Sequence, residues 1–249
     1  EVEVGDRVAY AGLPPGAYAE VRIMPADRLV KLPESISTHQ GAAMMLQGMT
    51  ARYLLRGCYE VKAGDSILIH AAAGGVGLIA CQWAKHLGAT VIGTVGSPEK
   101  AELAQNHGCD HPILYREEDF VSRVKEITNG RGVDVVYDSI GETTFMKSLD
   151  CLRPMGMIVS FGQASGPIPP MDISILAAKG SLFLTRPSLM AYTAERQDLL
   201  AHAQNLFEVV ERGAVKIEIH QTYPLAEAAQ AHRDLEGRKT TGSAVLVIE

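Results

Sequence analysis

Cysteine is scarce in this chain of 249 residues, and the few that occur lie far apart. The chain holds 4 cysteines, none of them in a C-x-x-C pair, namely Cys58, Cys81, Cys109 and Cys151. This spacing suggests neither a zinc ribbon nor the disulfide framework that small secreted domains use. A reducing compartment fits best, so we predict a cytoplasmic protein.

An excess of basic charge is also lacking. The formal net charge is -6 and the pI is near 5.8, which gives no global attraction to nucleic acid or acidic membranes. A local basic patch could still bind an anionic cofactor. Hydrophobic residues make up 47% of the chain and charged residues 21%, an ordinary globular composition with material for one large and one small domain.

The sequence has no initiator methionine. It begins at Glu1, and Val2–Tyr10 already has the pattern of a turn and a strand rather than that of a signal peptide. We therefore expect that a natural N-terminal segment, with its contribution to the site, is missing.

Charged side chains are absent from Ser66–Ala84, a stretch long enough to span a membrane. The embedded glycines, His70 and Gln82 argue against a membrane span. Ser66–His70 is instead an apolar run of strand length, and apolar residues at helical spacing follow it after a glycine turn. A second strand begins near Ala89, so the sequence predicts a β-α-β unit with glycines at the strand-to-helix junction.

The glycine turn departs from the usual Gly-x-Gly-x-x-Gly fingerprint, because Ala72, Gly74 and Gly77 occupy its three positions. Ala72 fits only if the turn keeps a negative φ there, while Gly74 permits close approach of phosphates and Gly77 permits tight packing of helix and strand. Free amides and a positive helix end at such a junction suit a pyrophosphate. The alternative is that these glycines serve packing alone.

A regular alternation of strands and helices follows. Strands are expected at 66–70, 89–94, 110–114, 133–138, 157–160 and 181–185. Helices are expected at 75–87, 97–107, 120–128, 143–149 and 173–179. Six strands with five intervening helices predict an α/β fold with a doubly wound parallel Rossmann sheet.

The flanking segments lack this rhythm. Before the sheet we expect strands at 7–10, 17–23 and 29–32, then two helices, 37–46 and 50–59, broken near Gly48. After it we expect a helix at 194–212, a strand near Ile217, a helix at 225–235 and a strand at 244–248 that returns to the N-terminal sheet. The predicted domains are therefore 1–49 with 186–249, and 50–185, with the active site in the cleft between them.

The end of the second strand indicates which dinucleotide is bound. NAD-binding units of this kind carry an Asp or Glu there, about 20 residues past the glycines, to bind the ribose. Here the tip has no carboxylate, and Ser97 and Pro98 begin a helix whose first turn holds Glu99 and Lys100. A 2′-phosphate would find a hydroxyl, a helix N-terminus and an ammonium, which favours NADPH. The alternative makes Lys100 a solvated lysine and Glu99 a displaced ribose ligand.

Metal ligands are missing where a zinc dehydrogenase would need them. Residues 41–50 contain no Cys, Asp or His, and the connection at 11–16 is too short for a four-cysteine lobe. The histidines are scattered, and each is expected to be structural or superficial: His39, His70, His86, His107, His111, His202, His220 and His232.

Several segments together resemble the zinc-free quinone oxidoreductases related to zeta-crystallin, in the medium-chain dehydrogenase/reductase superfamily. They are Gly5-Asp6-Arg7-Val8, Gly16-Ala17-Tyr18-Ala19-Glu20, residues 42–51, residues 70–77, residues 115–118, residues 136–141 and Thr185-Arg186-Pro187-Ser188. The resemblance implies that the flanking domain is GroES-like and that its N-terminal portion is absent. It also implies a homodimer paired through strand 181–185, an edge that invites pairing.

The resemblance further implies a set of NADPH-binding residues. Thr50, Ser188 and Leu189 would lie beside the nicotinamide, and Gly74, Gly75 and Val76 would hold the pyrophosphate. The 2′-phosphate and adenosine would contact Gly96, Ser97, Lys100 and Tyr115. The remaining contacts would be Ser139, Phe161, Gly162, Gln163 and, from near the C-terminus, Arg238.

These features predict an NADPH-dependent quinone reductase that passes hydride to a small quinone or similarly activated acceptor without zinc. No proton donor is assigned, and Gln47 and Tyr53 are weak catalytic candidates only because they flank the expected nicotinamide. Reduction of the C=C bond of an alkenal or enoyl thioester is the alternative enzyme activity. A non-catalytic NADPH-binding protein, structural or RNA-associated, is the alternative of another class, although no basic-aromatic stripe supports RNA binding.

Overall fold

The computed structural model describes residues 2–12 and 14–248, which fall into two compact units. The first unit comprises Glu1–Tyr53, Gly74–Ile79 and Leu189–Glu249, and the second comprises Leu54–Ala73 and Ala80–Ser188. The second unit is thus interrupted by the start of a helix that clusters with the first. The domain boundaries predicted from the sequence stay predictions.

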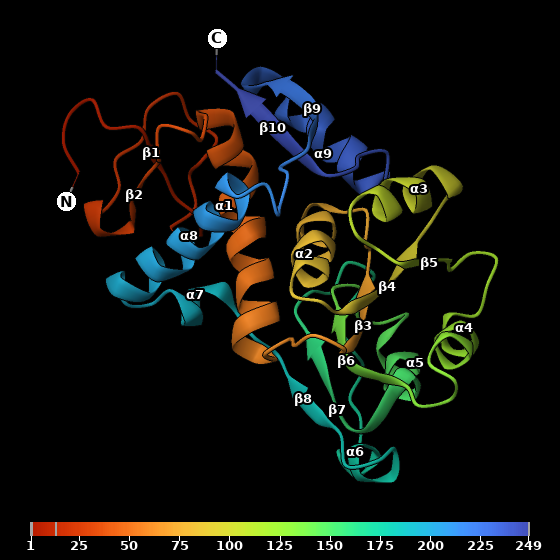
Figure 1. Ribbon diagram of the computed structural model, residues 1–249. Helices are drawn as coiled ribbons and strands as arrows, with labels where there is room; N and C mark the ends of the chain where they lie inside the picture. Colours follow the sequence, from red (N-terminus) through yellow and green to blue (C-terminus); the bar gives the residue numbers. More distant parts are fainter. Residues whose placement is uncertain (1, 13, 249) are drawn as a thin grey trace. The chain divides into compact units, whose positions relative to one another are not determined.

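Six parallel strands form one sheet in the second unit (Figure 1). They are β3 (Ser66–His70), β4 (Thr90–Val95), β5 (His111–Leu114), β6 (Val133–Asp138), β7 (Leu152–Ser160) and β8 (Phe183–Thr185). Their spatial order is β5-β4-β3-β6-β7-β8, so the chain builds one half of the sheet outward from β3 and the other half outward from β6. This is the order of a doubly wound dinucleotide-binding sheet, and it confirms the predicted fold class.

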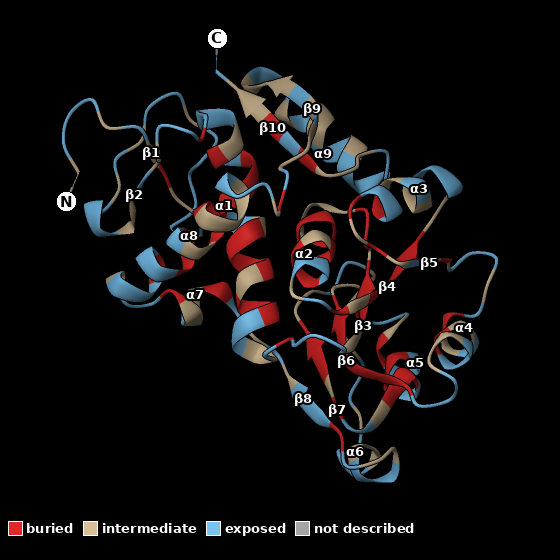
Figure 2. Cartoon of the chain, viewed as in Figure 1, coloured by how far each residue is buried: buried red, intermediate tan, exposed pale blue. Residues whose placement is uncertain are grey.

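The central strands are buried along nearly their whole length (Figure 2). All six residues of β6 are buried, and Ile69 of β3 lies between Gly93 of β4 and Tyr137 of β6. A parallel sheet covered on both faces requires such continuous apolar runs instead of alternation. One core cluster joins the strands to their helices through Leu68, Ile92, Phe120, Val136, Phe145 and Ile158.

The predicted connecting helices are present. They are α2 (Gly75–His86), α3 (Pro98–Asn106), α4 (Phe120–Ile127), α5 (Phe145–Ser148) and α6 (Ser174–Ala178), with a π-helix at Leu54–Cys58 and a 3-10 turn at Leu149–Cys151. Asp119 caps α4 by accepting from Ser122 N at 3.2 Å. Such caps satisfy amides that have no partner within the helix.

The first unit is built around two long helices that pack together, α1 (Thr38–Tyr53) and α8 (Arg196–Glu211) (Figure 1). Its short elements are β1 (Val8–Ala9), β2 (Val30–Lys31), α7 (Leu189–Tyr192) and 3-10 turns at Ala26–Arg28 and Leu225–Glu227. The C-terminal part consists of β9 (Ile219–Pro224), α9 (Ala228–Glu236) and β10 (Ser243–Val247).

The predicted helix break at Gly48 is wrong, because α1 continues through it from Thr38 to Tyr53. The glycine serves packing. A Cβ at Gly48 would lie 2.5 Å from both Cδ1 and Cδ2 of Leu206 on α8. The missing side chain lets α1 and α8 approach each other. The glycine that predicts a helix break in the sequence therefore marks a close contact between two helices.

We expect Gly48→Ala to destabilise the protein by about 1–3 kcal/mol, although alanine is the better helix former. The added methyl group must displace Leu206, whose side chain is fully buried. Chemical denaturation would measure the change in the free energy of unfolding. Leu206→Ala removes the obstructing atoms, so Gly48→Ala should cost clearly less in that background; equal costs in both backgrounds would contradict this explanation.

Two other predictions for the flanks are wrong. Residues 17–23 form no strand, and Val21 and Ile23 are 85% and 98% exposed, so their alternating pattern finds no neighbouring strand within the described chain. The C-terminal strands do not join the N-terminal ones in the described residues. β9 and β10 pair with each other in parallel, which α9 allows as the crossover, while β1 and β2 form a separate antiparallel pair.

Candidate nucleotide-binding site

The glycine turn lies where the sequence predicts it, between β3 and α2. Ala71 carries the positive φ of the turn, 56°, and Ala72 N donates to the carbonyl oxygen of Thr94 at 3.1 Å. The bond from Leu78 N to Gly74 O, at 2.9 Å, belongs to the first turn of α2. The amides of Gly75, Val76 and Gly77 precede it and have no acceptor within the helix, which is the geometry that binds anions.

Gln47 and Gly242 lie against this helix start within the first unit. A Cβ at Gly75 would be 3.2 Å from Gln47 Cγ and 3.3 Å from the carbonyl oxygen of Gly242. Gly74 also forms an isolated parallel bridge with Gly242. The Oε1 atom of Gln47 is buried and has no hydrogen-bond partner among the described residues. Since buried acceptors are normally paired, this atom suits a ligand that brings a donor.

A second group gathers at the ends of β4 and β5, within the second unit. Tyr115 Oη would be 3.0 Å from a Cβ at Gly96, so the tyrosine packs directly over the glycine. Ser97 caps α3 by accepting from Lys100 N at 3.4 Å. Hydrogen bonding from Ser97 also lowers the pKa of the Glu99 carboxyl. The structure therefore brings together Gly96, Ser97, Lys100 and Tyr115. Glu99 lies beside them and also forms a hydrogen bond with Ser97.

A third group forms where β6 and β7 end. Phe161 N donates to Asp138 O at 2.8 Å, and Ala164 N donates to Ser139 O at 3.1 Å. A Cβ at Gly162 would lie 2.6 Å from the carbonyl oxygen of Ser139 and 2.9 Å from its Cα. The two loops therefore touch through their backbones. They bring Ser139 together with Phe161, Gly162 and the exposed Gln163.

The segment after β8 is tied to this third group. Arg186 Nη1 donates to the carbonyl oxygen of Ser160 at 3.1 Å. The hydroxyl of Ser160 is buried and without a partner among the described residues. Ser188, the last residue of the unit, is exposed.

The remaining predicted residues belong to the first unit. Thr50 and Tyr53 are buried in α1, and the Tyr53 ring stacks on Tyr192 of α7 with centroids 4.8 Å apart and planes 10° apart. Leu189 is buried at the start of α7, so it shares this packing region. Arg238 is exposed and has a positive φ of 56° ahead of β10.

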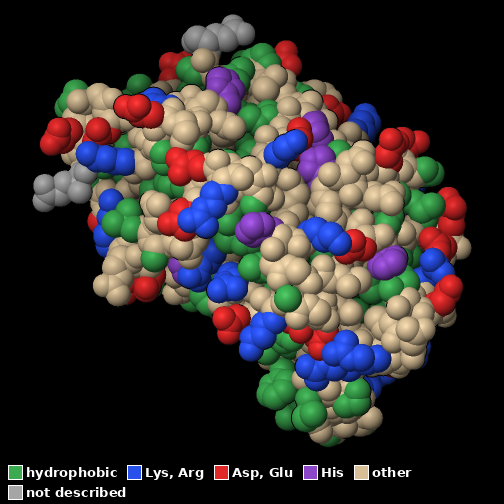
Figure 3. All heavy atoms as spheres, viewed as in Figure 1, with side chains coloured by type: hydrophobic (Ala, Val, Ile, Leu, Met, Phe, Trp, Pro, Cys, Tyr) green, Lys and Arg blue, Asp and Glu red, His purple; other side chains and the backbone are tan. Residues whose placement is uncertain are grey.

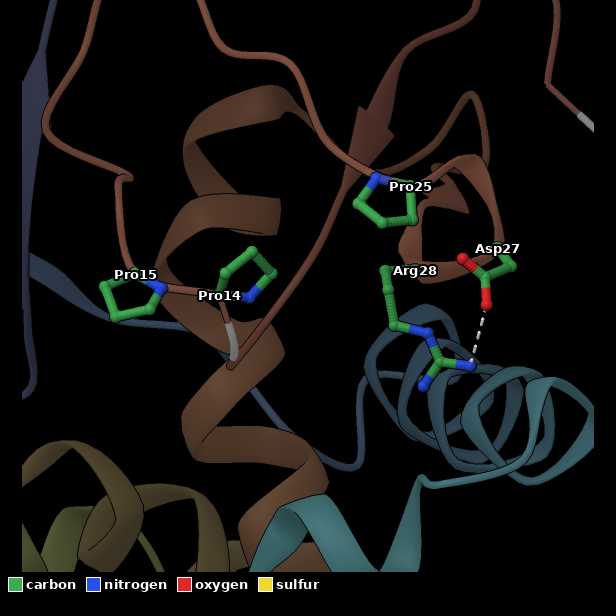
Figure 4. Close-up of a pocket in the computed structure, with 5 residues that line it drawn as sticks. All are labelled: Pro14, Pro15, Pro25, Asp27 and Arg28. Carbon is green, nitrogen blue, oxygen red and sulfur yellow. Dashed lines mark hydrogen bonds and ion pairs between the residues drawn. The ribbon is translucent and has the colours of Figure 1, made fainter.

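A shallow hollow of about 530 Å³ elsewhere in the first unit contains none of the predicted residues (Figure 4). It is lined by Pro14, Pro15, Pro25, Asp27 and Arg28. Among the described residues that line it, the charged ones are Asp27 and Arg28, and they form an ion pair at 3.2 Å. We therefore do not assign the cofactor to it.

Sequence reasoning missed Thr94, Asp138 and Ser148, which are almost completely buried in the second unit. His70, predicted to be structural or superficial, is 2% exposed and hydrogen-bonded, and its role stays a prediction. The signal that could have found Thr94 and Asp138 is that, like His70, they are polar residues at or next to the carboxyl ends of apolar strands.

Residues 2–12 and 14–248 contain no group of three or more His, Cys, Asp or Glu side chains arranged to hold a metal ion. Within the same residues, no helix combines the length and the apolar character that crossing a membrane requires.

Comparison with known proteins identifies the family. Residues 75–204 match the family model described as zinc-binding dehydrogenase. The quinone oxidoreductase of Pseudomonas aeruginosa is 54% identical over 98% of this chain and 75% of its own length. The chain belongs to the quinone oxidoreductase family of medium-chain dehydrogenases/reductases. A 2-haloacrylate reductase from Burkholderia is 50% identical over 98% of this chain and 74% of that protein.

Among solved structures of the family, the quinone oxidoreductase of Escherichia coli complexed with NADPH is 49% identical, with a TM-score of 0.96. The match covers 99% of this chain and 76% of the other. This chain therefore spans about three quarters of the length of these relatives.

Proposed function

We propose that the protein is an NADPH-dependent quinone oxidoreductase. The observation that carries the proposal is the 54% identity to a quinone oxidoreductase over 98% of the chain, together with a glycine turn at the start of a helix. Bound NADPH would supply the hydride, and the protein would bind and orient both cofactor and quinone. A cytoplasmic location is part of the same proposal.

The residues of the chain fit such a cofactor. The amides of Gly74, Gly75 and Val76 suit a pyrophosphate, and the unpaired Oε1 atom of Gln47 next to Gly75 suits a donor. The missing side chain of Gly96 lets Tyr115 pack over it, and the missing side chain of Gly162 lets the backbone of Ser139 approach, so each glycine brings assigned contacts together. We assign the other contacts to Thr50, Ser97, Lys100, Tyr115, Ser139, Phe161, Gln163, Ser188, Leu189 and Arg238.

No proton donor is assigned to the reaction. Tyr53 is only 3% exposed and its ring is stacked, which favours a packing role. Gln47 retains an unpaired polar atom, so it is the better candidate for a contact with cofactor or substrate. We infer that zinc is not required, because residues 41–50 provide no Cys, His or Asp.

A homodimer formed through β8 is also part of the proposal. β8 is an edge strand of the sheet, and its Phe183 and Leu184 side chains are 57% and 39% exposed. Hydrophobic side chains gather near α6 at the lower end of the surface in Figure 3, where Ile173 is 77% exposed. An apolar unpaired edge is the kind of surface that a second copy covers.

Stopped-flow oxidation of NADPH in the presence of a panel of quinones tests the proposed activity. We expect rapid loss of NADPH absorbance with quinones and much slower loss without an acceptor. If no quinone accelerates NADPH oxidation, the proposed activity is wrong.

Reduction of an activated C=C bond is the second candidate, because the 2-haloacrylate reductase is 50% identical to this chain. Turnover of enones and 2-haloacrylates in the same assay distinguishes the two. A higher kcat/KM for these acceptors than for quinones would favour the second candidate.

Lys100→Ala should weaken NADPH binding by about 10- to 100-fold and leave NADH binding nearly unchanged. The reason is that an ammonium beside a 2′-phosphate forms a charge-assisted hydrogen bond that NADH cannot form. Titration of the protein with each nucleotide, followed by nicotinamide fluorescence, measures both dissociation constants. Lys125→Ala, which alters an exposed lysine on α4, is the matched control. Equal losses for NADPH and NADH would contradict the assignment of the 2′-phosphate site.

A further inference from the structure

A continuous chain of buried polar side chains joins three strands of the sheet. His70 at the end of β3 has its Nδ1 atom 2.9 Å from Thr94 Oγ1 on β4 and its Nε2 atom 2.9 Å from Ser148 Oγ on α5. Ser148 Oγ is in turn 3.4 Å from Oδ2 of Asp138 at the end of β6. All four side chains are at most 2% exposed. A connected polar chain inside an apolar sheet requires an explanation beyond packing.

The hydrogen-bond partners suit one direction of donation along this chain. Ser148 has one hydroxyl proton, which it donates to Thr144 O at 2.9 Å or to Asp138. With that proton on Thr144 O or Asp138, Ser148 accepts from His70 Nε2, and the neutral imidazole then accepts at Nδ1 from Thr94. Burial lowers the pKa of His70, and the charge of Asp138 opposes this shift to a smaller extent. The lowered pKa favours the neutral ring. Phe120 packs edge-on against the ring, 5.0 Å between centroids, and presents no charge to it.

Asp138 shapes the loop that follows β6. Its Oδ1 atom accepts from the amides of Ile140 and Gly141 at 2.8 and 3.0 Å, and from Thr144 Oγ1 at 3.0 Å. Its position therefore sets the backbone of residues 139–141, which include the assigned contact Ser139.

The other end of the chain holds the glycine turn. Thr94 accepts at its carbonyl oxygen from Ala72 N, at 3.1 Å, and lies two residues before Gly96. His70 directly precedes Ala71, whose φ of 56° is unfavourable for alanine and persists only where neighbouring contacts hold it. The polar chain is thus connected to the loops that follow β3, β4 and β6, and the proposed function assigns all three loops to the cofactor.

We propose that Thr94, His70, Ser148 and Asp138 are positioning residues that hold the three cofactor-binding loops in mutual register, so that cofactor binding depends on hydrogen bonds that never touch the cofactor. This inference rests on the proposed function. It assigns to the four residues a role in binding NADPH and none in hydride transfer.

The matched pair Thr94→Val and Thr94→Ser tests the proposal. Valine keeps the shape of threonine and removes the donor to His70, while serine keeps the donor and removes a methyl group. With NADPH fluorescence titration well below the unfolding temperature, we expect Thr94→Val to weaken NADPH binding about tenfold and Thr94→Ser to restore most of it. In steady-state assays the KM for NADPH should rise while kcat stays within about twofold. Thr90→Val, at the other end of β4, is the control and should bind normally.

Hydrogen exchange followed by mass spectrometry gives a readout that does not depend on the cofactor. Thr94→Val should accelerate the exchange of amides in residues 71–78 and also in the more distant residues 139–144. The exchange rates of amides in α8 should stay unchanged. If Thr94→Val does not fold, Ser148→Ala breaks the same chain at its other joint and should give the same pattern.

The outcomes separate this inference from the function on which it rests. If the unaltered protein binds no NADPH, the proposed function fails and the inference fails with it. If the unaltered protein binds NADPH and Thr94→Val binds it equally well, only the inference is overturned. A lower unfolding temperature with unchanged NADPH affinity would likewise reduce the four residues to a purely structural role.

Discussion

Gly162→Ala is expected to abolish measurable NADPH binding and to lower the free energy of unfolding by about 2–4 kcal/mol. The added methyl group would lie 2.6 Å from the carbonyl oxygen of Ser139 and 2.9 Å from its Cα. These are backbone atoms, so no side-chain rotation relieves the clash. The loops after β6 and β7 must move apart, and both carry residues assigned to the cofactor. Nucleotide titration and chemical denaturation measure the two effects.

Gln163→Ala is the control for the stability effect of Gly162→Ala alone, because Gln163 is the exposed neighbour in the same loop. It should leave the free energy of unfolding within about 0.5 kcal/mol of the original value, as ordinary surface substitutions do. A Gly162→Ala protein that is as stable as the original and binds NADPH normally would show that the two loops are not in the contact described.

Asp134→Ala should lower the free energy of unfolding by about 3 kcal/mol. The Asp134 side chain is 3% exposed and lies 2.6 Å from Arg153 and 2.6 Å from Arg131, and it also accepts from Ser66 N at 2.9 Å. Its removal leaves the Ser66 amide and the Nε atom of the partly buried Arg153 without their acceptor. Arg131 is half exposed, so its share of the loss is small. Chemical denaturation at pH 7 gives the change.

The same carboxylate makes stability depend on pH. Burial alone would raise the pKa of Asp134, but hydrogen bonds from Arg131, Arg153 and the Ser66 amide outweigh it and hold the pKa below the ordinary value of 3.8. The ionised form is therefore favoured in the folded state. Its contribution is fully present above about pH 4 and is lost as the pH falls through the lowered folded pKa. Asp134→Asn should flatten this acid dependence, and an unchanged acid-unfolding curve would contradict the assignment.

The sheet and its helices could be predicted from the sequence because each buried parallel strand is a short apolar run and each covering helix has its own periodicity. The junction at Gly74–Gly77 and the cap at Ser97 were readable for the same reason, since each depends on residues close in sequence. The doubly wound order followed from the count of alternating elements.

Contacts between distant residues could not be predicted. The sequence around Gly48 predicts a helix break because no nearby residue indicates the contact with Leu206 of α8. The sequence predicts a strand only from residue 157, whereas β7 begins at Leu152, because Arg153 and Pro154 make its first part less apolar. A hydrogen bond from Arg153 to the distant Asp134 stabilises this part of the strand. The positive φ of Ala71 could not be predicted, because contacts across the sheet maintain this strained conformation. The hydrogen bonds of His70 could not be predicted because Thr94 and Ser148 are distant in sequence.

The pairing of β3 with β6 has a consequence for how the chain acquires its structure. β3 and β4 pair across a single helix, whereas Ile67 of β3 must find Val135 of β6 across two further helix–strand repeats. Closing so long a loop is slow, because its entropy is lost before any contact compensates for it. Refolding from denaturant should therefore begin with a half-sheet of β3, β4 and β5, and the bare flank of β3 would be its most aggregation-prone surface until β6 arrives.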